Sequence, residues 1–390
     1  MKICAKCVLD NTVPEIIYDE KGVCNYCKIH QELIDIYPLG KEGEEIMNQL
    51  SQKIKIKSRS NKYDCIVGVS GGTDSTYLLY YVVKILKLKP LAVHFDNGWN
   101  SDIAVKNIKN ATNKLGVDLY THVANWEEFK DLQISFLKAS TPDAEVPTDF
   151  VIFSVLYNLA KKEKVKYIIE GHSFRAEGTT PIGWTYLDAR YIKNVQRKFG
   201  SKRIKSFPII SLFKLLNYTF IKKIKTVRPL EYLDYSKPKA QELIKRELGW
   251  QDPGGHHHES IYTKFFQSYY LPEKFNIDKR KRELSAKIRS GILTRQEALS
   301  ELKVNYPVEK GIVDYVIKKL GISEEEFKLI MNSKVKSFVD YNTYFSLIQF
   351  FRYPIKIACK LHLFPPIVYL KYGINHTKKI QEYWSAYNKK

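Results

Sequence analysis

The sequence predicts an α/β fold, in which a parallel sheet stands between a cysteine-rich N-terminal module and a mainly helical C-terminal part. Short apolar runs, typical of buried strands, alternate with helix-period segments between residues 64 and 170. A glycine turn joins the first of these runs to the helix that follows it. Two Cys-x2-Cys pairs near the N-terminus predict a separate metal-binding module.

The alternation has the spacing of right-handed crossover units, which places the strands side by side and parallel. The predicted strands are 64–69, 90–95, 118–123 and 166–170, and the predicted helices among them are 75–87, 102–115, 127–139 and 147–163. From about residue 200 the pattern is mainly helical, with helices at 237–248, 280–289, 294–302 and 324–332. Thr294 with Glu297 forms a capping-box pattern, and Ser323 is the expected cap of the last helix.

These patterns divide the chain into four parts. We expect a cysteine module at 1–30, a helical linker at 31–58, the α/β domain at 59–235 and a mainly helical region at 236–390. The last part is expected to complete the functional site and to supply packing or partner contacts.

Each cysteine pair, Cys4 with Cys7 and Cys24 with Cys27, can bring two thiolates onto one metal ion. Four thiolates complete a closed tetrahedral zinc site, which would be structural because no coordination position stays open. Disulfides are an alternative, but the N-terminus does not resemble a signal peptide, so we expect reduced thiols and a cytoplasmic protein. An iron–sulfur cluster is a second alternative.

Residues 66–76 read Ile-Val-Gly-Val-Ser-Gly-Gly-Thr-Asp-Ser-Thr. A strand, a glycine turn and a helix in this order present several backbone N–H groups to an anion. The predicted phosphate-binding residues are Ser70, Gly71, Gly72, Thr73, Asp74 and Ser75. Asp74, an acid among phosphates, would be a Mg²⁺ ligand. The lysine of a Walker loop is absent, and the alternative is an ordinary glycine turn capped by Ser and Asp.

Two other strand ends are polar, at His94-Phe95-Asp96-Asn97-Gly98-Trp99 and at Glu170-Gly171-His172-Ser173. Ligands of open parallel sheets bind at the carboxyl ends of the strands. We therefore expect these two segments and the glycine loop to form the walls of one site.

The chain has 63 Lys and Arg against 42 Asp and Glu, a formal net charge of +21. This balance suits a nucleic-acid binder, but lysine is spread throughout, so we expect attraction to small anionic substrates or membrane surfaces and no specific nucleic acid. No segment predicts a transmembrane helix, because cations and prolines interrupt the most apolar stretch, 344–372. This stretch could lie peripherally on a membrane surface, or form a helical pair packed on the body or a partner, which we favour.

The glycine loop resembles the PP-loop of ATP pyrophosphatases, which holds the pyrophosphate that leaves when a substrate oxygen is adenylylated. With the cysteine pairs, Asp96-Asn97-Gly98-Trp99 and Gly254-Gly255-His256-His257-His258-Glu259-Ser260, the chain is similar to the bacterial N-acetyl sugar amidotransferases of surface-polysaccharide (O-antigen) biosynthesis. The resemblance covers roughly residues 1–305. It implies a PP-loop domain of the adenine nucleotide α-hydrolase-like (HUP) class.

The resemblance implies an AMP-forming ligase that uses ATP and Mg²⁺ to convert a sugar acetamido group into an acetamidino group. The loop would bind the pyrophosphate portion, and His94, Phe95 and Asp96 the adenosine, although Asp96 could instead cap a helix. Gly171 would let the backbone approach the nucleotide. Glu170 would hold Mg²⁺ or be a mere surface carboxylate.

Further catalytic residues are expected in the C-terminal part. Three consecutive histidines cannot all reach one ion, so a single one, His257, is expected to face the site. Lys264 is the candidate cation for the transition-state phosphate, and a solvated lysine is the alternative.

The partners follow from the same resemblance. The substrate would be a nucleotide-linked N-acetyl sugar, and a separate glutaminase subunit with a cyclase-like conduit would deliver ammonia. No cysteine lies in a glycine-rich elbow that could hydrolyse glutamine within this chain.

The main rival is a tRNA-modifying PP-loop enzyme, either a thiolase or a lysidine-type ligase. A thiolase usually needs a cysteine pair, and the two remaining cysteines, Cys65 in the first strand and Cys359 far downstream, make a poor one. A non-catalytic binding module would leave an intact PP-loop unexplained.

Overall fold

The computed structural model describes residues 2–254, 259–361, 363–364, 366–373 and 376–389. Five parallel strands form a sheet in the order β3-β2-β1-β4-β5. The strands are β1 Cys65–Gly68, β2 Pro90–Asp96, β3 Leu119–Val123, β4 Tyr167–Ile169 and β5 Lys225–Val227. The predicted α/β fold with a parallel sheet is confirmed, and the edge strand β5 is an addition to it.

Nineteen α-helices accompany the sheet in the described part of the chain. The first nine are α1 Asn25–Ile36, α2 Gly40–Ser58, α3 Thr73–Tyr80, α4 Asp102–Leu115, α5 Trp126–Ala139, α6 Val146–Lys162, α7 Ala189–Phe199, α8 Leu212–Leu216 and α9 Lys237–Leu248. The others are α10 Ile261–Phe265, α11 Leu271–Phe275, α12 Arg280–Arg289, α13 Arg295–Glu301, α14 Ile312–Leu320, α15 Glu324–Asn332, α16 Phe345–Phe350, α17 Arg352–Lys360, α18 Pro366–Tyr372 and α19 Thr377–Tyr387. Single π-helical turns extend α3, α8 and α10 as η1 Tyr81–Ile85, η2 Asn217–Ile221 and η4 Phe266–Tyr270.

Local signals placed several helices correctly. Helices α4, α9 and α12 have the predicted bounds. Thr294 and Glu297 form the predicted capping box, and the Ser323 side chain accepts a hydrogen bond from the backbone of α15. The expected linker stretch 31–58 consists of two helices, since Pro38 lies between α1 and α2 and lacks the N–H that a continuous helix needs.

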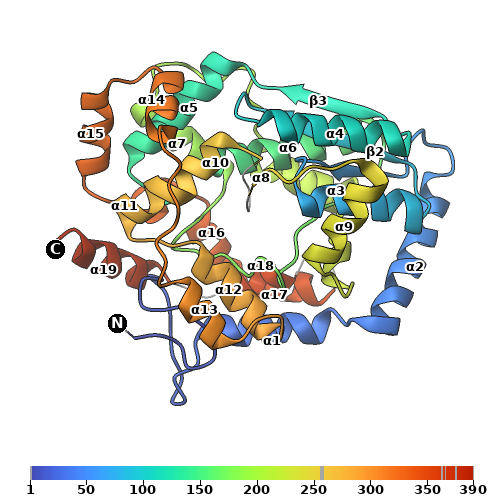
Figure 1. Ribbon diagram of the computed structural model, residues 1–390, viewed down its shortest axis with the longest axis horizontal. Helices are drawn as coiled ribbons and strands as arrows, with labels where there is room; N and C mark the ends of the chain where they lie inside the picture. The colour runs from blue at the N-terminus through green and yellow to red at the C-terminus, as the bar shows by residue number, and fades with distance from the viewer. Residues whose placement is uncertain (1, 255–258, 362, 365, 374–375, 390) are drawn as a thin grey trace.

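Helices cover both faces of the sheet (Figure 1). Alternate residues of a strand point to opposite faces. Val67 of β1 is buried in one core with Leu79 of α3, and α4 and α9 contribute to the same core. Ile66 is buried in the other core with Leu156 of α6. The chain thus crosses to the far side of β1 after β3, and the carboxyl ends of β1 and β4 meet at this reversal of strand order, where ligands of such sheets bind.

The four N-terminal cysteines form one buried cluster. Their sulfurs all lie within 4.8 Å of one another, with 3.8 Å from Cys4 to Cys27 and from Cys7 to Cys24, and 3.6 Å from Cys24 to Cys27. A tetrahedral ion with thiolate bonds of about 2.3 Å would separate its sulfurs by about 3.8 Å. The arrangement therefore fits one metal ion with four thiolate ligands. All four cysteines are free of disulfides.

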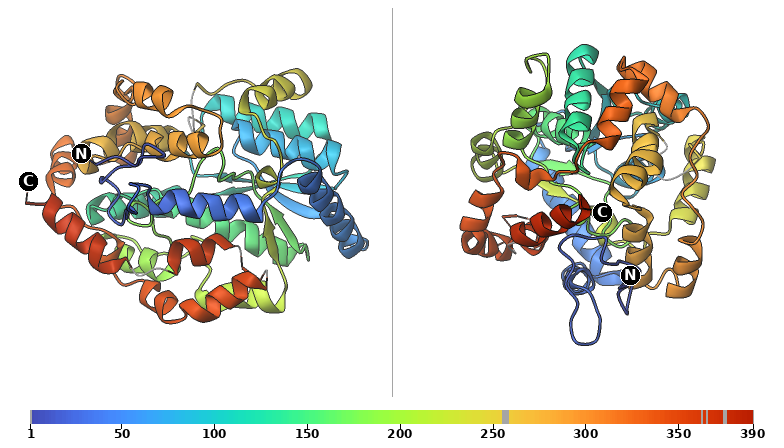
Figure 2. Two further views of the ribbon diagram at one scale, coloured as in Figure 1. Left: turned by 90° about the horizontal axis from the view of Figure 1, so that it is seen from below. Right: turned by 90° about the vertical axis from the view of Figure 1, so that its left-hand side faces the viewer.

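Arg289 at the end of α12 fixes the cluster to the body of the protein. Its guanidinium donates hydrogen bonds to the Sγ atoms of Cys27 at 3.3 Å and Cys7 at 3.1 Å. Although burial opposes its charge, the nearby cysteine sulfurs raise the pKa of Arg289. Arg295 of α13 donates to the backbone carbonyls of Cys7 and Cys4. The N-terminal module is therefore held by helices from the C-terminal part, and both chain ends lie at the same end of the molecule (Figures 1 and 2).

None of the helices in the described ranges is long and apolar enough to span a bilayer, as the sequence predicts.

Asn107 of α4 connects the glycine loop to the segment after α9. Its Nδ2 donates to the carbonyls of Gly71 at 3.0 Å and Gln251 at 2.8 Å, and its Oδ1 accepts from the backbone N–H of Gln251 at 2.8 Å. The side chain is buried.

We expect Asn107→Ala to lower the free energy of unfolding by about 2–3 kcal/mol, because it removes a buried side chain and its three hydrogen bonds. Asn110→Ala is the matched control: it lies on the same helix, is half-buried and makes one long hydrogen bond, 3.4 Å to the Gly249 carbonyl. Urea unfolding of both variants measures the difference. Equal losses in the two variants would contradict the anchoring role of Asn107.

Candidate nucleotide-binding site

The glycine loop lies between β1 and α3, with its backbone held from behind. Gly71 has φ +83°, and a Cβ atom on it would lie 2.4 Å from the Ala104 carbonyl oxygen of α4, so only glycine fits. The Gly71 carbonyl accepts hydrogen bonds from Asn107 and from the Trp250 indole, at 3.0 and 2.9 Å. Helix α3 begins at Thr73, so the backbone N–H groups of its first turn have no partner earlier in the helix. These are the groups that could bind phosphate oxygens.

The loop forms one wall of a cavity of about 590 Å³. The predicted loop residues that line it are Ser70, Gly72, Thr73, Asp74 and Ser75. His94 and Phe95 at the end of β2, and Glu170 and Gly171 after β4, form further walls. The C-terminal part supplies Glu259 beside the loop, and it supplies a further wall that includes Thr263, Lys279 and Arg282. The three polar strand ends therefore meet, as the parallel sheet predicts.

Two carboxylates flank the loop. Asp74 accepts a hydrogen bond from the Tyr235 hydroxyl. Burial, together with Asp74, raises the pKa of Tyr235, so this phenol remains a donor. Glu259 accepts from the Ser70 hydroxyl at 3.3 Å, and a Cβ on Gly72 would lie 2.8 Å from its Oε1. Mg²⁺ in nucleotide sites uses one or two carboxylates and completes its shell with phosphate oxygens and water, so Asp74 and Glu259 are suited to hold it.

His94 is held in one orientation by two neighbours. Its Nδ1 lies 3.0 Å from the Val69 carbonyl and so donates to it, which leaves Nε2 to accept from the Asn100 amide at 3.1 Å. Burial lowers its pKa, and a neutral ring matches these partners. Asp96 accepts from the backbone N–H of Gly98 and from Asn100, and it lies outside the cavity lining. Asp96 therefore holds the turn after β2, and the cap of α4 is Ser101.

Glu170 and Gly171 serve the cavity in different ways. The Glu170 carboxylate accepts two hydrogen bonds from Arg228, both at 3.2 Å, so it forms an ion pair at the cavity wall. Glu231 on the other side of Arg228 has its pKa raised to about 7 by burial. The Cα of Gly171 faces the start of α3: a Cβ there would be 3.3 Å from the Asp74 carbonyl carbon. Gly171 thus allows the end of β4 to pack closely on the start of α3.

Lys264, predicted as the catalytic cation, is placed elsewhere: it pairs with Glu309 and lies outside the cavity lining. Thr263 and Gln267, one turn apart, face the cavity, and the residue after Thr263 is rotated by about 100° around the helix. His256, His257 and His258 lie outside the described residues.

The cations that do line the cavity are Lys237, Arg228, Lys279, Arg282 and Lys371. Lys279 lies 3.8 Å from Glu145, and burial lowers its pKa. Arg282 donates to the Thr180 hydroxyl at 2.6 Å. The sequence contains no local signal for these cations, because the chain has 63 Lys and Arg. Glu259 was not predicted as a site residue either, although it lies in the recognisable motif 254–260.

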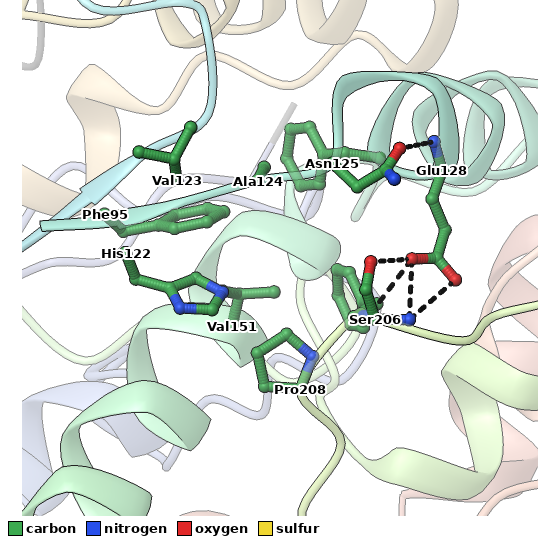
Figure 3. A pocket seen from close by; sticks show the side chains of 11 residues that line it. Phe95, His122, Val123, Ala124, Asn125, Glu128, Val151, Ser206 and Pro208 are labelled. Carbon is green, nitrogen blue, oxygen red and sulfur yellow. Dashed lines mark hydrogen bonds between the residues drawn. The ribbon is translucent and has the colours of Figure 1, made fainter.

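A smaller cavity of about 270 Å³ adjoins the first at Phe95 (Figure 3). Glu128 dominates its polar side and accepts hydrogen bonds from the backbone N–H groups of Ser206 at 2.9 Å and Phe207 at 3.1 Å. Burial opposes its charge, but these hydrogen bonds and one from the Ser206 hydroxyl lower the pKa of Glu128. Its carboxylate is thus used to hold the loop after α7 against α5.

Solved structures that match this chain include the NH3-dependent NAD synthetase of Campylobacter jejuni, with 11% identity, a TM-score of 0.33 and coverage of 75% of this chain and 97% of that one. Another is the U34-tRNA thiolase NcsA of Methanococcus maripaludis, with 16% identity, a TM-score of 0.30 and coverage of 86% and 90%. Similarity at this level says nothing about activity.

One protein and one family are similar to this chain in sequence. The uncharacterized protein MJ1599 of Methanocaldococcus jannaschii is 26% identical over 313 residues, which cover 77% of this chain and 92% of that protein. Residues 259–353 match the family described as "LPS biosynthesis protein WbpG-like, C-terminal domain". The matched segment begins at Glu259 and includes Thr263, Lys279 and Arg282 of the cavity wall. After its α/β domain, the chain therefore carries a segment similar to the C-terminal domain of the WbpG-like lipopolysaccharide-biosynthesis family.

Proposed function

We propose that this protein is an ATP-dependent amidotransferase that converts the acetamido group of a nucleotide-linked N-acetyl sugar into an acetamidino group. The observation that carries the proposal is the shared cavity, since the PP-loop lines one wall and the lipopolysaccharide-type domain the other. Its volume of about 590 Å³ lies within the usual range of small-molecule sites.

In the proposed reaction the amide oxygen attacks the α-phosphate of ATP, and pyrophosphate leaves. Ammonia then adds to the carbon of the adenylylated imidate, loses a proton, and AMP departs with the former amide oxygen. Acetamide, ammonia and ATP thus give acetamidine, AMP and pyrophosphate. Activation is needed because an amide oxygen is otherwise a poor leaving group.

The side chains divide this work by position. Loop N–H groups and the hydroxyls of Ser70, Thr73 and Ser75 bind the departing pyrophosphate. Asp74 and Glu259 would hold Mg²⁺, which supplies positive charge to the phosphate oxygens. Lys279 and Arg282, on the wall from the C-terminal part, are the proposed cations for the second substrate and for charge developing on the α-phosphate.

The rival assignment as a tRNA thiolase receives less support. Cys65 is fully buried in β1, where burial raises its thiol pKa well above the usual value. Cys359 lies on α17. Among the described residues that line the cavity there is no cysteine to carry sulfur.

We further propose that the N-terminal cysteine cluster holds zinc. A single ion accounts for four sulfurs within 4.8 Å, whereas a cubane cluster puts a different iron behind each thiolate and so spreads the sulfurs further apart. Four thiolates on one Zn²⁺ leave two negative charges, and Arg289 offsets part of them.

The first prediction concerns the ATP products. We expect AMP and pyrophosphate, and we expect Asp74→Asn to lower turnover by about a hundredfold or more while the fold is kept, because the charge is lost at constant volume. Glu259→Gln should act in the same direction. The matched control is Asp102→Asn, an exposed acid in the first turn of α4, which should leave turnover unchanged. Formation of ADP and phosphate, read by chromatography, would disprove the pyrophosphatase assignment.

The second prediction concerns the metal. Elemental analysis of the protein should give about one zinc per chain. Cys24→Ser should lose the metal and lower the unfolding temperature, because metal binding is coupled to folding. Cys359→Ser, outside the cluster, should keep the zinc. A visible absorption spectrum typical of an iron–sulfur cluster in anaerobically purified protein would refute the zinc assignment.

The third prediction concerns the nitrogen source. Free ammonium should support the reaction without any partner, whereas glutamine should work only after a glutaminase subunit is added. Mass spectrometry of the sugar product would show a loss of about one mass unit as oxygen is replaced by NH. Glutamine hydrolysis by the isolated chain would contradict the need for a partner. Strong stimulation of AMP release by tRNA would instead favour the rival class.

A further inference from the structure

The C-terminal helix α17 presents its apolar side to solvent. Tyr353 and Ile357 of α17 and Leu361 directly after it follow one another at spacings of four residues, so they form one stripe, and Phe350 at the end of α16 precedes it. Each is well exposed, from 59% for Ile357 to 78% for Phe350. The buried side of the helix holds Cys359. A helix that only packed on the body would bury such a stripe.

A second segment adds to this surface. Phe213 of α8 is 83% exposed, and Phe220 and Ile221 of η2 are exposed as well. The rings of Phe220 and Phe364, which precedes α18, lie in edge contact with centroids 5.3 Å apart. Figure 2 shows the red helices α16 to α18 beside the yellow-green segment of α8. We call these residues the aromatic patch: Phe213, Phe220, Ile221, Phe350, Tyr353, Ile357 and Leu361.

The two segments that carry the aromatic patch contain Lys and Arg but no Asp or Glu. On α17, Arg352, Lys356 and Lys360 form a stripe directly beside the apolar one. Lys222 and Lys223 follow Ile221 and are exposed. Residues 189–230 contain twelve Lys and Arg, residues 341–381 contain six, and neither stretch contains an Asp or Glu. The positive charge of the chain is therefore not only a uniform excess of lysine, since these two segments are purely basic.

We propose that the aromatic patch docks this protein onto an anionic membrane surface. An interfacial helix of this kind buries an apolar face at the headgroup boundary while its Lys and Arg reach the phosphates. Charge complementarity favours an anionic bilayer, and the exposed Phe, Ile and Leu side chains on the same basic segments favour it over a nucleic acid. Lys371 of α18 lines the main cavity, so a docked membrane would lie close to that cavity. The proposal is independent of the reaction proposed above.

Flotation with vesicles tests the proposal on the full chain. We expect binding to vesicles of phosphatidylcholine mixed with phosphatidylglycerol, little binding to phosphatidylcholine alone, and weaker binding as salt is raised. Phe213→Ser with Phe350→Ser should weaken binding to the anionic vesicles by about tenfold or more, because two exposed rings are removed from the interface. Lys222→Glu with Lys223→Glu should weaken it as well.

The controls are exposed residues outside the patch. Leu329→Ser removes a side chain of α15 that is 73% exposed, and Lys53→Glu with Lys55→Glu changes charge on α2. Both should bind vesicles like the unchanged chain, and circular dichroism with thermal unfolding should show that every variant is folded. Three results would overturn the proposal: no binding to anionic vesicles, equal binding by the patch and control variants, or a dimer that Phe213→Ser with Phe350→Ser dissociates. Tighter binding to tRNA than to anionic vesicles would overturn it too.

Discussion

A phosphate-binding loop has to keep its N–H groups available to the ligand, so the protein must hold it by other atoms. Here the Gly71 carbonyl is the main attachment, because two buried donors, the Asn107 amide and the Trp250 indole, converge on it. The first comes from α4 and the second from the segment after α9. The loop is thus shaped by the sheet and by residues almost two hundred positions away. The α/β domain is therefore incomplete without the start of the C-terminal part.

Local chemistry explains what the sequence could predict. The glycine loop, the cysteine pairs, the helix caps and the bounds of α4, α9 and α12 all depend on residues close together in the chain. The meeting of three strand ends followed from one general property of parallel sheets. The short edge strand β5 was not predicted, because three residues are too few to show the alternation of apolar and polar side chains that marks a strand.

The rest of the site depends on distant contacts. Lys264 and Thr263 are neighbours in sequence, yet they point in different directions from the helix. Thr263 faces the cavity, whereas Lys264 forms an ion pair with Glu309 outside it. Asp96 and Glu170 both stand at polar strand ends, and the sequence favours neither of them as a ligand-binding residue. In the structure, Asp96 accepts hydrogen bonds from Gly98 and Asn100, and Glu170 forms an ion pair with Arg228. The stripe on α17 illustrates the same limit: its periodicity is identical whether it faces the core or solvent, and only the folded chain decides.

Helix α12 joins two sites that the sequence keeps far apart. Arg282 stands in the wall of the cavity, and Arg289, two turns further on, touches the cysteine sulfurs. The helix has ten residues and is about 15 Å long, so it spans the distance between the two sites as one rigid element. The cysteine cluster and the cavity wall therefore share one short helix, so a displacement of the cluster also displaces Arg282 in the cavity wall.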